Sequence, residues 1–267
     1  TLSLVVEREK EIRAFIPRNY WEVEGEFQAA GGTYTGRWFD EGFKKGEDEH
    51  ARAERLWQEQ SAESIRGECL GKPGIVTDTA KPENRLSPLL FDLTSLQREA
   101  NTRFGFSAKT TLSIAQALYE RHKVLTYPRT DSRALPEDYL PTVHNVLAGL
   151  PDLYAPFANE IVKEGWVKPN KRIFNNTKIS DHFAIIPTGT VPKSLSEVEA
   201  KLYDFVVRRF LSVFYPAAEY LVTTRITRVG AHPFKTEGKV LVKKGWLTVY
   251  GKEESDEETN LPAVTDG

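Results

Sequence analysis

The sequence predicts an α+β fold, in which strand-forming segments near both ends of the chain enclose a mainly helical middle. Apolar and polar residues alternate between positions 20 and 39 and again between 219 and 242, which is the period of half-buried strands. Between these regions, apolar residues recur every three or four positions, as on one face of a helix. The 267 residues exceed the usual size of one domain, so we expect two units or one elaborated unit.

The N-terminal region combines two strands with charged helical segments. A helical pattern covers Glu7 to Phe15. From Tyr20 to Phe27 the apolar residues share one face and the glutamates the other, which predicts a half-buried strand. Gly31-Gly32 predicts a turn into a second strand, Thr33 to Phe39. The segment from Glu47 to Ile65 is charged and helix-prone, so we expect a surface helix there.

The first strong helix of the middle region is expected to begin after Ser107, a residue type that favours the N-cap position. Its apolar stripe reaches Tyr119. Arg121, His122 and Lys123 follow, where positive charges interact favourably with the helix C-terminus.

A second helix is predicted from Ser194 to Tyr215, with Ser194 and Glu197 as a capping box and Pro216 as its stop. Its buried stripe is expected to contain Val198, Leu202, Phe205, Val206 and Phe210.

Strand patterns return near the C-terminus. Residues 219–229 and 234–242 alternate on either side of a break at 230–233, and a short apolar run follows at 246–250. Residues 253–258 are acidic and are expected to form a flexible linker.

Composition limits the class of protein. Hydrophobic content of 40% with 28% charged residues is typical of a soluble globular protein, with no apolar stretch long enough to span a bilayer and no secretory signal. The single cysteine, Cys69, excludes internal disulfides and fits a reducing cytoplasm. A net charge of −2 means that any basic, DNA-binding surface must be local. The chain starts at Thr1 and has no methionine, so we interpret it as a fragment.

One octapeptide carries candidate chemistry: Leu125-Thr126-Tyr127-Pro128-Arg129-Thr130-Asp131-Ser132. A phenol is a poor nucleophile at neutral pH because its usual pKa is about 10. The Arg129 guanidinium can stabilise a forming phenolate and can bind a phosphate bidentately. Pro128 restricts the backbone between the two side chains. Most Tyr-Pro pairs only shape turns or strand ends, but this combination indicates attack by a tyrosine oxygen on a phosphodiester.

The octapeptide closely resembles the active-site motif of type IA DNA topoisomerases, in particular the bacterial topoisomerase III branch. Three further segments are similar to that family in the same order: Thr1 to Val6, Ser87 to Asn101, and Ser180 to Thr188. Many relatives carry a second histidine where Phe183 stands, so only His182 is transferred as a site residue.

The resemblance implies a β-rich arch domain, residues 1–85 and 217–267, interrupted by a mainly helical domain, residues 86–216, that bears the nucleophile. It implies transient cleavage of one DNA strand through a 5′-phosphotyrosine on Tyr127, strand passage and religation without ATP. Arg129 and His182 are the further catalytic candidates, with Asp181 a candidate to set the histidine tautomer. The expected DNA contacts are Arg129, Thr130, Asp131, Ser132, Arg133 and His182.

The same resemblance implies a Mg²⁺ site in a Toprim domain that this chain lacks. Glu47, Asp48 and Glu49 lie in a hydrophilic stretch, and there is no zinc-spaced set of cysteines and histidines, so we predict no bound metal here. The expected partners are single-stranded DNA and the remaining domains of the same polypeptide, in a bacterial cytoplasm and without a membrane. The chain alone is expected to be inactive.

Two other classes compete with this interpretation. A tyrosine recombinase or nicking enzyme would use a similar nucleophile together with further arginines and histidines, and we find no such clusters. A non-catalytic DNA-binding or scaffold module would leave Tyr127 unreactive.

Overall fold

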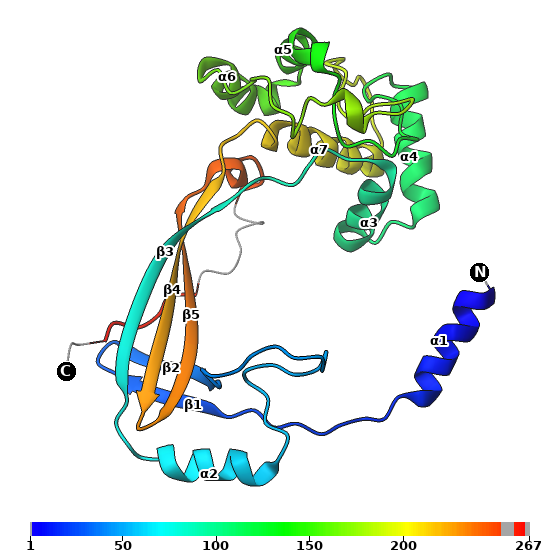
Figure 1. Cartoon of the computed structure of the whole chain (residues 1–267). Coiled ribbons are helices and arrows are strands. Elements are labelled where there is room, and N and C mark those ends of the chain that lie inside the picture. The colour runs from blue at the N-terminus through cyan, green and yellow to red at the C-terminus, as the bar shows by residue number, and fades with distance from the viewer. Residues whose placement is uncertain (1, 252–258, 265–267) are drawn as a thin grey trace. The chain divides into compact units, whose positions relative to one another are not determined.

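The computed structural model describes residues 2–251 and 259–264, and it divides into two compact units (Figure 1). The β unit comprises Thr1–Lys81, Leu221–Val240 and Glu258–Gly267, and the helical unit comprises Pro82–Tyr220 and Leu241–Glu257. The acidic linker expected at 253–258 lies outside the described residues. The domain division expected from the sequence differs from these units at residues 82–85, 217–220 and 241–257, and it stays a prediction.

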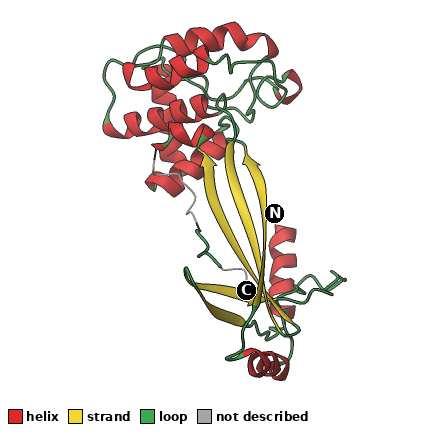
Figure 2. Cartoon of the chain, turned by 90° about the vertical axis from the view of Figure 1, so that its left-hand side faces the viewer, coloured by secondary structure: helices red, strands yellow, loops and turns green. Residues whose placement is uncertain are grey.

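The β unit holds two helices, a hairpin and most of three long strands, as the colouring by secondary structure shows (Figure 2). The sheet order is β1-β2-β5-β4-β3. β1 and β2 pair antiparallel, with Phe27 opposite Tyr34, and Trp38 of β2 lies opposite Phe234 of β5. The elements are α1 (Leu2–Ala14), β1 (Glu24–Ala29), β2 (Gly32–Trp38), α2 (Glu59–Cys69), β3 (Ile75–Arg85), β4 (Ala218–Val229) and β5 (His232–Lys243).

The alternating pattern around β1 is confirmed. From Trp21 to Ala29 every second residue is partly buried, and the glutamates between them are exposed. The core beneath the hairpin contains Ile65 of α2, Val229 and Phe234, with Phe27 and Trp38 packed against it. Burial of these apolar side chains explains why the charged helix α2 stays on the sheet.

The helix predicted for Glu47 to Ile65 is wrong over most of its length, because only α2 is helical. Upstream of it, the Asp48 carboxylate accepts from the His50 N–H at 2.9 Å, and Arg55 donates to the His50 carbonyl at 2.8 Å. Such side-chain bonds to local backbone groups compete with helix formation.

Strand β3 had no counterpart in the sequence prediction. Ten of its eleven residues are exposed, so it lacks the alternation of a half-buried strand. Its position at the edge of the sheet and Pro82 within it agree with the confinement of proline to edge strands.

The helical unit packs α3 against α4, α4 against α7, and α6 against both α5 and α7. Ten of the sixteen residues of α7 are buried. This helix is therefore the centre of the unit. The elements are α3 (Leu93–Phe104), α4 (Ala108–Glu120), α5 (Leu140–Ala148), α6 (Ala155–Lys163), α7 (Glu197–Ser212) and short 3-10 helices at Glu137–Tyr139, Asp152–Tyr154, Asn176–Lys178 and Gly245–Val249.

The start of α7 differs from the prediction. The capping box is formed by Ser196 and Glu199, not by Ser194 and Glu197, and it shifts the first turn by two residues. Val198 is consequently 40% exposed and does not belong to the buried stripe. The N-cap predicted at Ser107 is confirmed, since its side chain accepts from the Thr110 N–H.

None of the helices in residues 2–251 is both long enough and apolar enough to cross a membrane.

Candidate active site around Tyr127

The chain turns sharply between α4 and the octapeptide. The N–H of the C-cap residue Arg121 still bonds to the Ala117 carbonyl. Lys123 then adopts φ 58°, a left-handed conformation that is uncommon for a residue other than glycine. The Val124 N–H returns to the Leu118 carbonyl at 2.9 Å. The octapeptide thus starts against the last turn of the helix.

A second segment, residues 182–188, runs beside the octapeptide and fixes its backbone. The Thr126 N–H donates to the Ile186 carbonyl at 2.9 Å, and the Thr188 N–H donates to the Val124 carbonyl at 3.0 Å. The Thr126 hydroxyl adds two bonds, donating to the Ala184 carbonyl and accepting from the Ile186 N–H. The segment before Tyr127 is therefore held by backbone and side chain together.

The Tyr127 ring lies between two other rings. Its centroid is 4.3 Å from that of His182 and 5.4 Å from that of Tyr119, which it meets edge-on at 78°. The residue is half-buried, and no described residue forms a hydrogen bond with its hydroxyl. The ring is held in place while its oxygen remains available to an incoming group.

Arg129 is exposed, and its side chain has one hydrogen bond, from Nη2 to Gln116 Oε1 at 3.3 Å. Within the part of the chain that the structure describes, no acidic side chain pairs with it. An arginine without a carboxylate partner retains its donors and its charge for an anionic ligand.

The next residues of the motif shape the loop. The Thr130 hydroxyl donates to the His182 carbonyl at 2.9 Å and accepts from the Ser132 N–H. Thr130 and Ser132 are only 7% and 3% exposed. Their hydroxyl groups hold the loop in shape, so the DNA contact predicted for these two residues would require the loop to open.

Asp131 and Arg133 differ in their partners, which are a neutral hydroxyl for Asp131 and a carboxylate for Arg133. Asp131 is exposed and accepts from the Ser180 hydroxyl at 3.2 Å. Arg133 Nε lies 3.1 Å from Asp92 Oδ2, so this guanidinium is already balanced by a carboxylate. Arg129 is therefore the better placed of the two arginines for a phosphate, and the DNA contacts of Asp131 and Arg133 stay predictions.

His182 is exposed and its ring faces Tyr127, which brings two of the three predicted catalytic residues together. The described contacts include no hydrogen bond between Asp181 and this ring, so the structure gives no support to Asp181 as the group that sets its tautomer. The histidine is positioned instead by its own backbone carbonyl, which accepts from Thr130.

The basic residues at the end of α4 are tied to α7. Arg121 donates to Glu199, and His122 Nε2 lies 3.3 Å from the same carboxylate. The pKa of the Glu199 carboxyl is lowered from 4.5 to about 2. The main cause is the hydrogen bond from the Ser196 N–H, and the nearby charges of Arg121 and His122 add to it. Arg121 and His122 thus hold α4 against α7. Of the basic residues between the end of α4 and Arg129, Lys123 and Arg129 have no acidic partner among the described residues.

Sequence reasoning missed two residues of α4 that contact the motif, Gln116 and Tyr119. They are three positions apart and therefore lie on one face of the helix. Their three-residue spacing, in the helix that leads directly to Tyr127, is the pattern from which these contacts could have been predicted.

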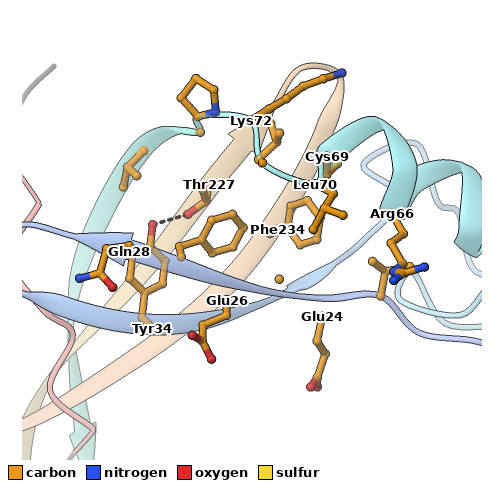
Figure 3. A pocket seen from close by; sticks show the side chains of 18 of the residues that line it. Glu24, Glu26, Gln28, Tyr34, Arg66, Cys69, Leu70, Lys72, Thr227 and Phe234 are labelled. Carbon is orange, nitrogen blue, oxygen red and sulfur yellow. Dashed lines mark hydrogen bonds between the residues drawn. The ribbon is translucent and has the colours of Figure 1, made fainter.

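The β unit contains a separate cavity that no motif predicted (Figure 3). Its volume is about 1020 Å³, and it lies between β1, the end of α2 and the residues that follow α2. Phe234 and Tyr34 line it, and the Tyr34 hydroxyl bonds to the Thr227 hydroxyl at 2.8 Å (Figure 3). Burial raises the pKa of the Cys69 thiol beside it, so this cysteine is a poor nucleophile.

No group of three or more His, Cys, Asp or Glu side chains that could hold a metal ion occurs in residues 2–251 and 259–264. Asp131 of the motif accepts from Ser180, and Asp92, which pairs with Arg133, also accepts from Ser95. These two carboxylates are therefore already engaged by donors within the described part of the chain.

Comparison with known proteins gives a consistent result. A family model described as DNA topoisomerase matches residues 1–267. The chain is 39% identical to DNA topoisomerase 3 of Bacillus subtilis and 40% identical to that of Bacillus licheniformis, each over 100% of this chain and 36% of the relative. It thus spans about a third of the length of these relatives. Full-length topoisomerase I from Thermotoga maritima has a similar fold, with a TM-score of 0.63 at 23% identity over 100% of this chain and 41% of that one.

Proposed function

Because the chain belongs to the DNA topoisomerase family, as its motifs predict, we propose that it carries the DNA-cleaving tyrosine of a type IA enzyme of the topoisomerase III kind. In the intact protein, Tyr127 would cleave one DNA strand, hold the broken end while another strand passes, and reseal it. Supercoil relaxation and decatenation both follow from this cycle.

One observation supports the proposal most strongly. The Tyr127 oxygen has no hydrogen-bond partner among the described residues, while its ring is held by His182 and Tyr119. On the same fixed segment, Arg129 has no acidic partner in the described chain. A nucleophile and a phosphate-binding group in a fixed relation are what attack on a phosphodiester requires.

The proposed chemistry is a reversible exchange of esters. The Tyr127 oxygen loses its proton and attacks the phosphorus, the bond from phosphorus to the 3′ oxygen breaks, and that oxygen leaves as a 3′-hydroxyl after taking up a proton. The 5′ phosphate remains esterified to Tyr127. One phosphoester replaces another, so the reverse attack by the 3′-hydroxyl reseals the strand without ATP.

Arg129 would bind the phosphate oxygens as negative charge builds on them, through its bidentate fork. His182 would contact the DNA phosphate or relay a proton, because its ring lies beside the Tyr127 ring. Asp131 and Arg133 are proposed to line the DNA path, and Thr130 and Ser132 are proposed to act mainly by shaping the loop beside it.

Mg²⁺ is proposed to act from carboxylates outside this chain, as the family resemblance implies. The proposed partners are single-stranded DNA and the remaining domains of the polypeptide, within a bacterial cytoplasm.

Covalent trapping in the full-length protein tests the proposal. A single-stranded oligonucleotide labelled at its 3′ end should label the protein, and the label should map to the peptide containing Tyr127. The same oligonucleotide labelled at its 5′ end should leave the protein unlabelled. Label on another residue, or transfer from the 5′ end, would contradict the assignment, and DNA binding without any adduct would favour a non-catalytic module.

A second test addresses the source of the carboxylates. The 267-residue chain alone, incubated with negatively supercoiled plasmid and Mg²⁺, should neither cleave nor relax it. Reproducible relaxation by the chain alone would overturn the placement of the metal site.

A further inference from the structure

We infer that Gln116 and Tyr119 of α4 are positioning residues for the proposed cleavage, Gln116 for the Arg129 guanidinium and Tyr119 for the Tyr127 ring. The inference rests on the proposed function and deepens it. It assigns a role to α4, the helix that precedes the motif, and none of the matching sequence motifs predicted that role.

Gln116 holds the guanidinium through an oriented amide. Its Oε1 accepts from Arg129 Nη2 at 3.3 Å, and its Nε2 donates to Glu120 Oε1 at 3.5 Å. The bond to Glu120 fixes which end of the amide faces Arg129. A neutral acceptor restrains the guanidinium without neutralising its charge, whereas a carboxylate at this position would compete with the phosphate.

Restraint matters for Arg129 because an exposed arginine otherwise samples many rotamers. The described structure gives its side chain no other hydrogen bond. Holding it near the position required in the reaction reduces the ordering that must occur when the phosphate arrives.

Tyr119 fixes the plane of the nucleophile's ring. Its ring meets that of Tyr127 edge-on at 5.4 Å, while His182 lies on another side at 4.3 Å. Lys123 Nζ lies 5.6 Å from the Tyr119 ring centroid and helps to hold that ring in turn. An edge-on aromatic contact of this kind has a preferred geometry and so restricts rotation of the Tyr127 ring.

The helix links the two contacts. Side chains three residues apart on a helix are neighbours, with Cβ atoms about 5–6 Å from each other. Gln116 and Tyr119 therefore set the spacing between the phosphate-binding group and the nucleophile from one rigid element, and the backbone of Pro128 sets it from the other side.

Two variants of the full-length protein test the inference. Gln116→Met keeps the length of the side chain and removes the acceptor, and Tyr119→Leu keeps an apolar group and removes the ring. Each should slow single-turnover cleavage by about tenfold to a hundredfold, the scale of a small misplacement of a reacting group. Affinity for single-stranded DNA should stay close to parental, since no DNA contact is removed.

Two further variants serve as controls. Tyr119→Phe retains the ring and should cleave at the parental rate. Ser113→Ala changes an exposed position one turn earlier on α4 and should also behave as the parent. Loss of cleavage in either control, or parental cleavage in both Gln116→Met and Tyr119→Leu, would overturn the inference.

A double-mutant cycle separates positioning from a general effect on folding. If Gln116 acts through Arg129, then Gln116→Met should have no additional effect in an Arg129→Ala background. Additive losses would contradict the assigned route.

Crystal structures of the parent, Gln116→Met and Tyr119→Leu give a measure that does not depend on cleavage. Arg129 should lose its place in the first variant and the Tyr127 ring in the second. Unchanged positions would refute the inference even if Tyr127 is the nucleophile. Absence of any adduct in the parent would refute the proposed function while the structures still decide the positioning.

Discussion

Two segments of the chain have almost no regular secondary structure, yet they are built in opposite ways. Residues 124–135, around Tyr127, bond to a neighbouring segment through buried backbone groups and through the Thr126 and Thr130 hydroxyls. Residues 40–58, in the β unit, are largely exposed and rely on charged side chains such as the Arg18–Asp48 pair. Irregular backbone is therefore no sign of looseness. Buried hydrogen bonds can fix a loop as firmly as a strand, and the segment that needs fixed geometry has them.

Two carboxylates extend the comparison: Glu199 of α7, which contacts the end of α4 just before residues 124–135, and Asp48 within residues 40–58. Glu199 and Asp48 each accept from a backbone N–H and an arginine, and in both cases these bonds lower the pKa. The Glu199 side chain is 7% exposed, however, whereas the Asp48 side chain is 37% exposed. Water competes for Asp48 and much less for Glu199, so the contact between the end of α4 and α7 should depend more strongly on its ion pair than residues 40–58 depend on theirs.

The largest expected effect is that of Tyr127→Phe. Removing one oxygen from a ring held between His182 and Tyr119 should abolish all DNA–protein adducts in the full-length enzyme, while packing and single-strand binding stay nearly parental. Trapping with 3′-labelled oligonucleotide and a binding titration measure the two quantities. Adduct formation by Tyr127→Phe would remove the functional reason for the fixed segment.

The second-largest effect is expected from replacing Arg129. Arg129→Ala should slow single-turnover cleavage by about 10²–10³, the contribution of one donor aimed at developing charge. The loss of one phosphate contact should weaken DNA affinity much less. Arg129→Lys keeps the charge but loses the bidentate fork, and it should be impaired too. Parental cleavage in both variants, or cleavage that falls only in proportion to affinity, would contradict the phosphate-binding role.

Thr126→Val tests whether buried hydrogen bonds fix the motif. The change removes the acceptor of the Ile186 N–H and the donor to Ala184, and it should weaken this contact by about 1–3 kcal/mol. Hydrogen exchange of the Ile186 amide measures the effect locally. Thr102→Val is the matched control, because its exposed hydroxyl bonds only to a carbonyl of its own helix. Equal exchange in the two variants would show that the Thr126 bonds are dispensable.

The smallest expected effect concerns how stability depends on pH. Because the pKa of Glu199 is lowered from 4.5 to about 2, its ionised form stabilises the folded state above pH 4.5, and this contribution is lost as the pH falls from about 4.5 towards 2. Glu199→Gln should lower Tm near neutral pH and flatten the loss of Tm in acid. Asp48→Asn should flatten the curve less, because the pKa of Asp48 is lowered too but its carboxylate is more exposed to water, and equal flattening there would remove the contrast between the two carboxylates.

The sequence predicted those parts of the molecule whose pattern is local. The alternation around Trp21 to Ala29, the Ser107 cap and the two long strands near the C-terminus follow from side-chain period and capping chemistry. The sequence prediction failed where tertiary contacts or local side-chain hydrogen bonds decide the secondary structure. Charged residues 47–58 have helix propensity, but their side chains bond to the backbone and form turns. Strand β3 lacks a buried face, so no periodicity marks it.

The site shows the same division. The resemblance identified Tyr127, Arg129 and His182 by residue type, and the structure places Tyr127 beside His182. The burial of Thr130 and Ser132, and the ion pair between Arg133 and Asp92, arise from contacts far apart in sequence. Gln116 and Tyr119 were not predicted as site residues, because a glutamine and a tyrosine in a helix indicate no functional role until their spatial neighbours are known.

The left-handed residue between α4 and the motif also limits how this sequence can vary. A residue with a β-carbon at φ 58° costs about 1–2 kcal/mol, which the rest of the fold must offset. Glycine and asparagine adopt this conformation most readily, and lysine is an exception that also places its ammonium group near the Tyr119 ring. Valine, isoleucine and threonine, by contrast, crowd the backbone there. Position 123 should therefore accept only a few residue types, because its backbone geometry limits the choice.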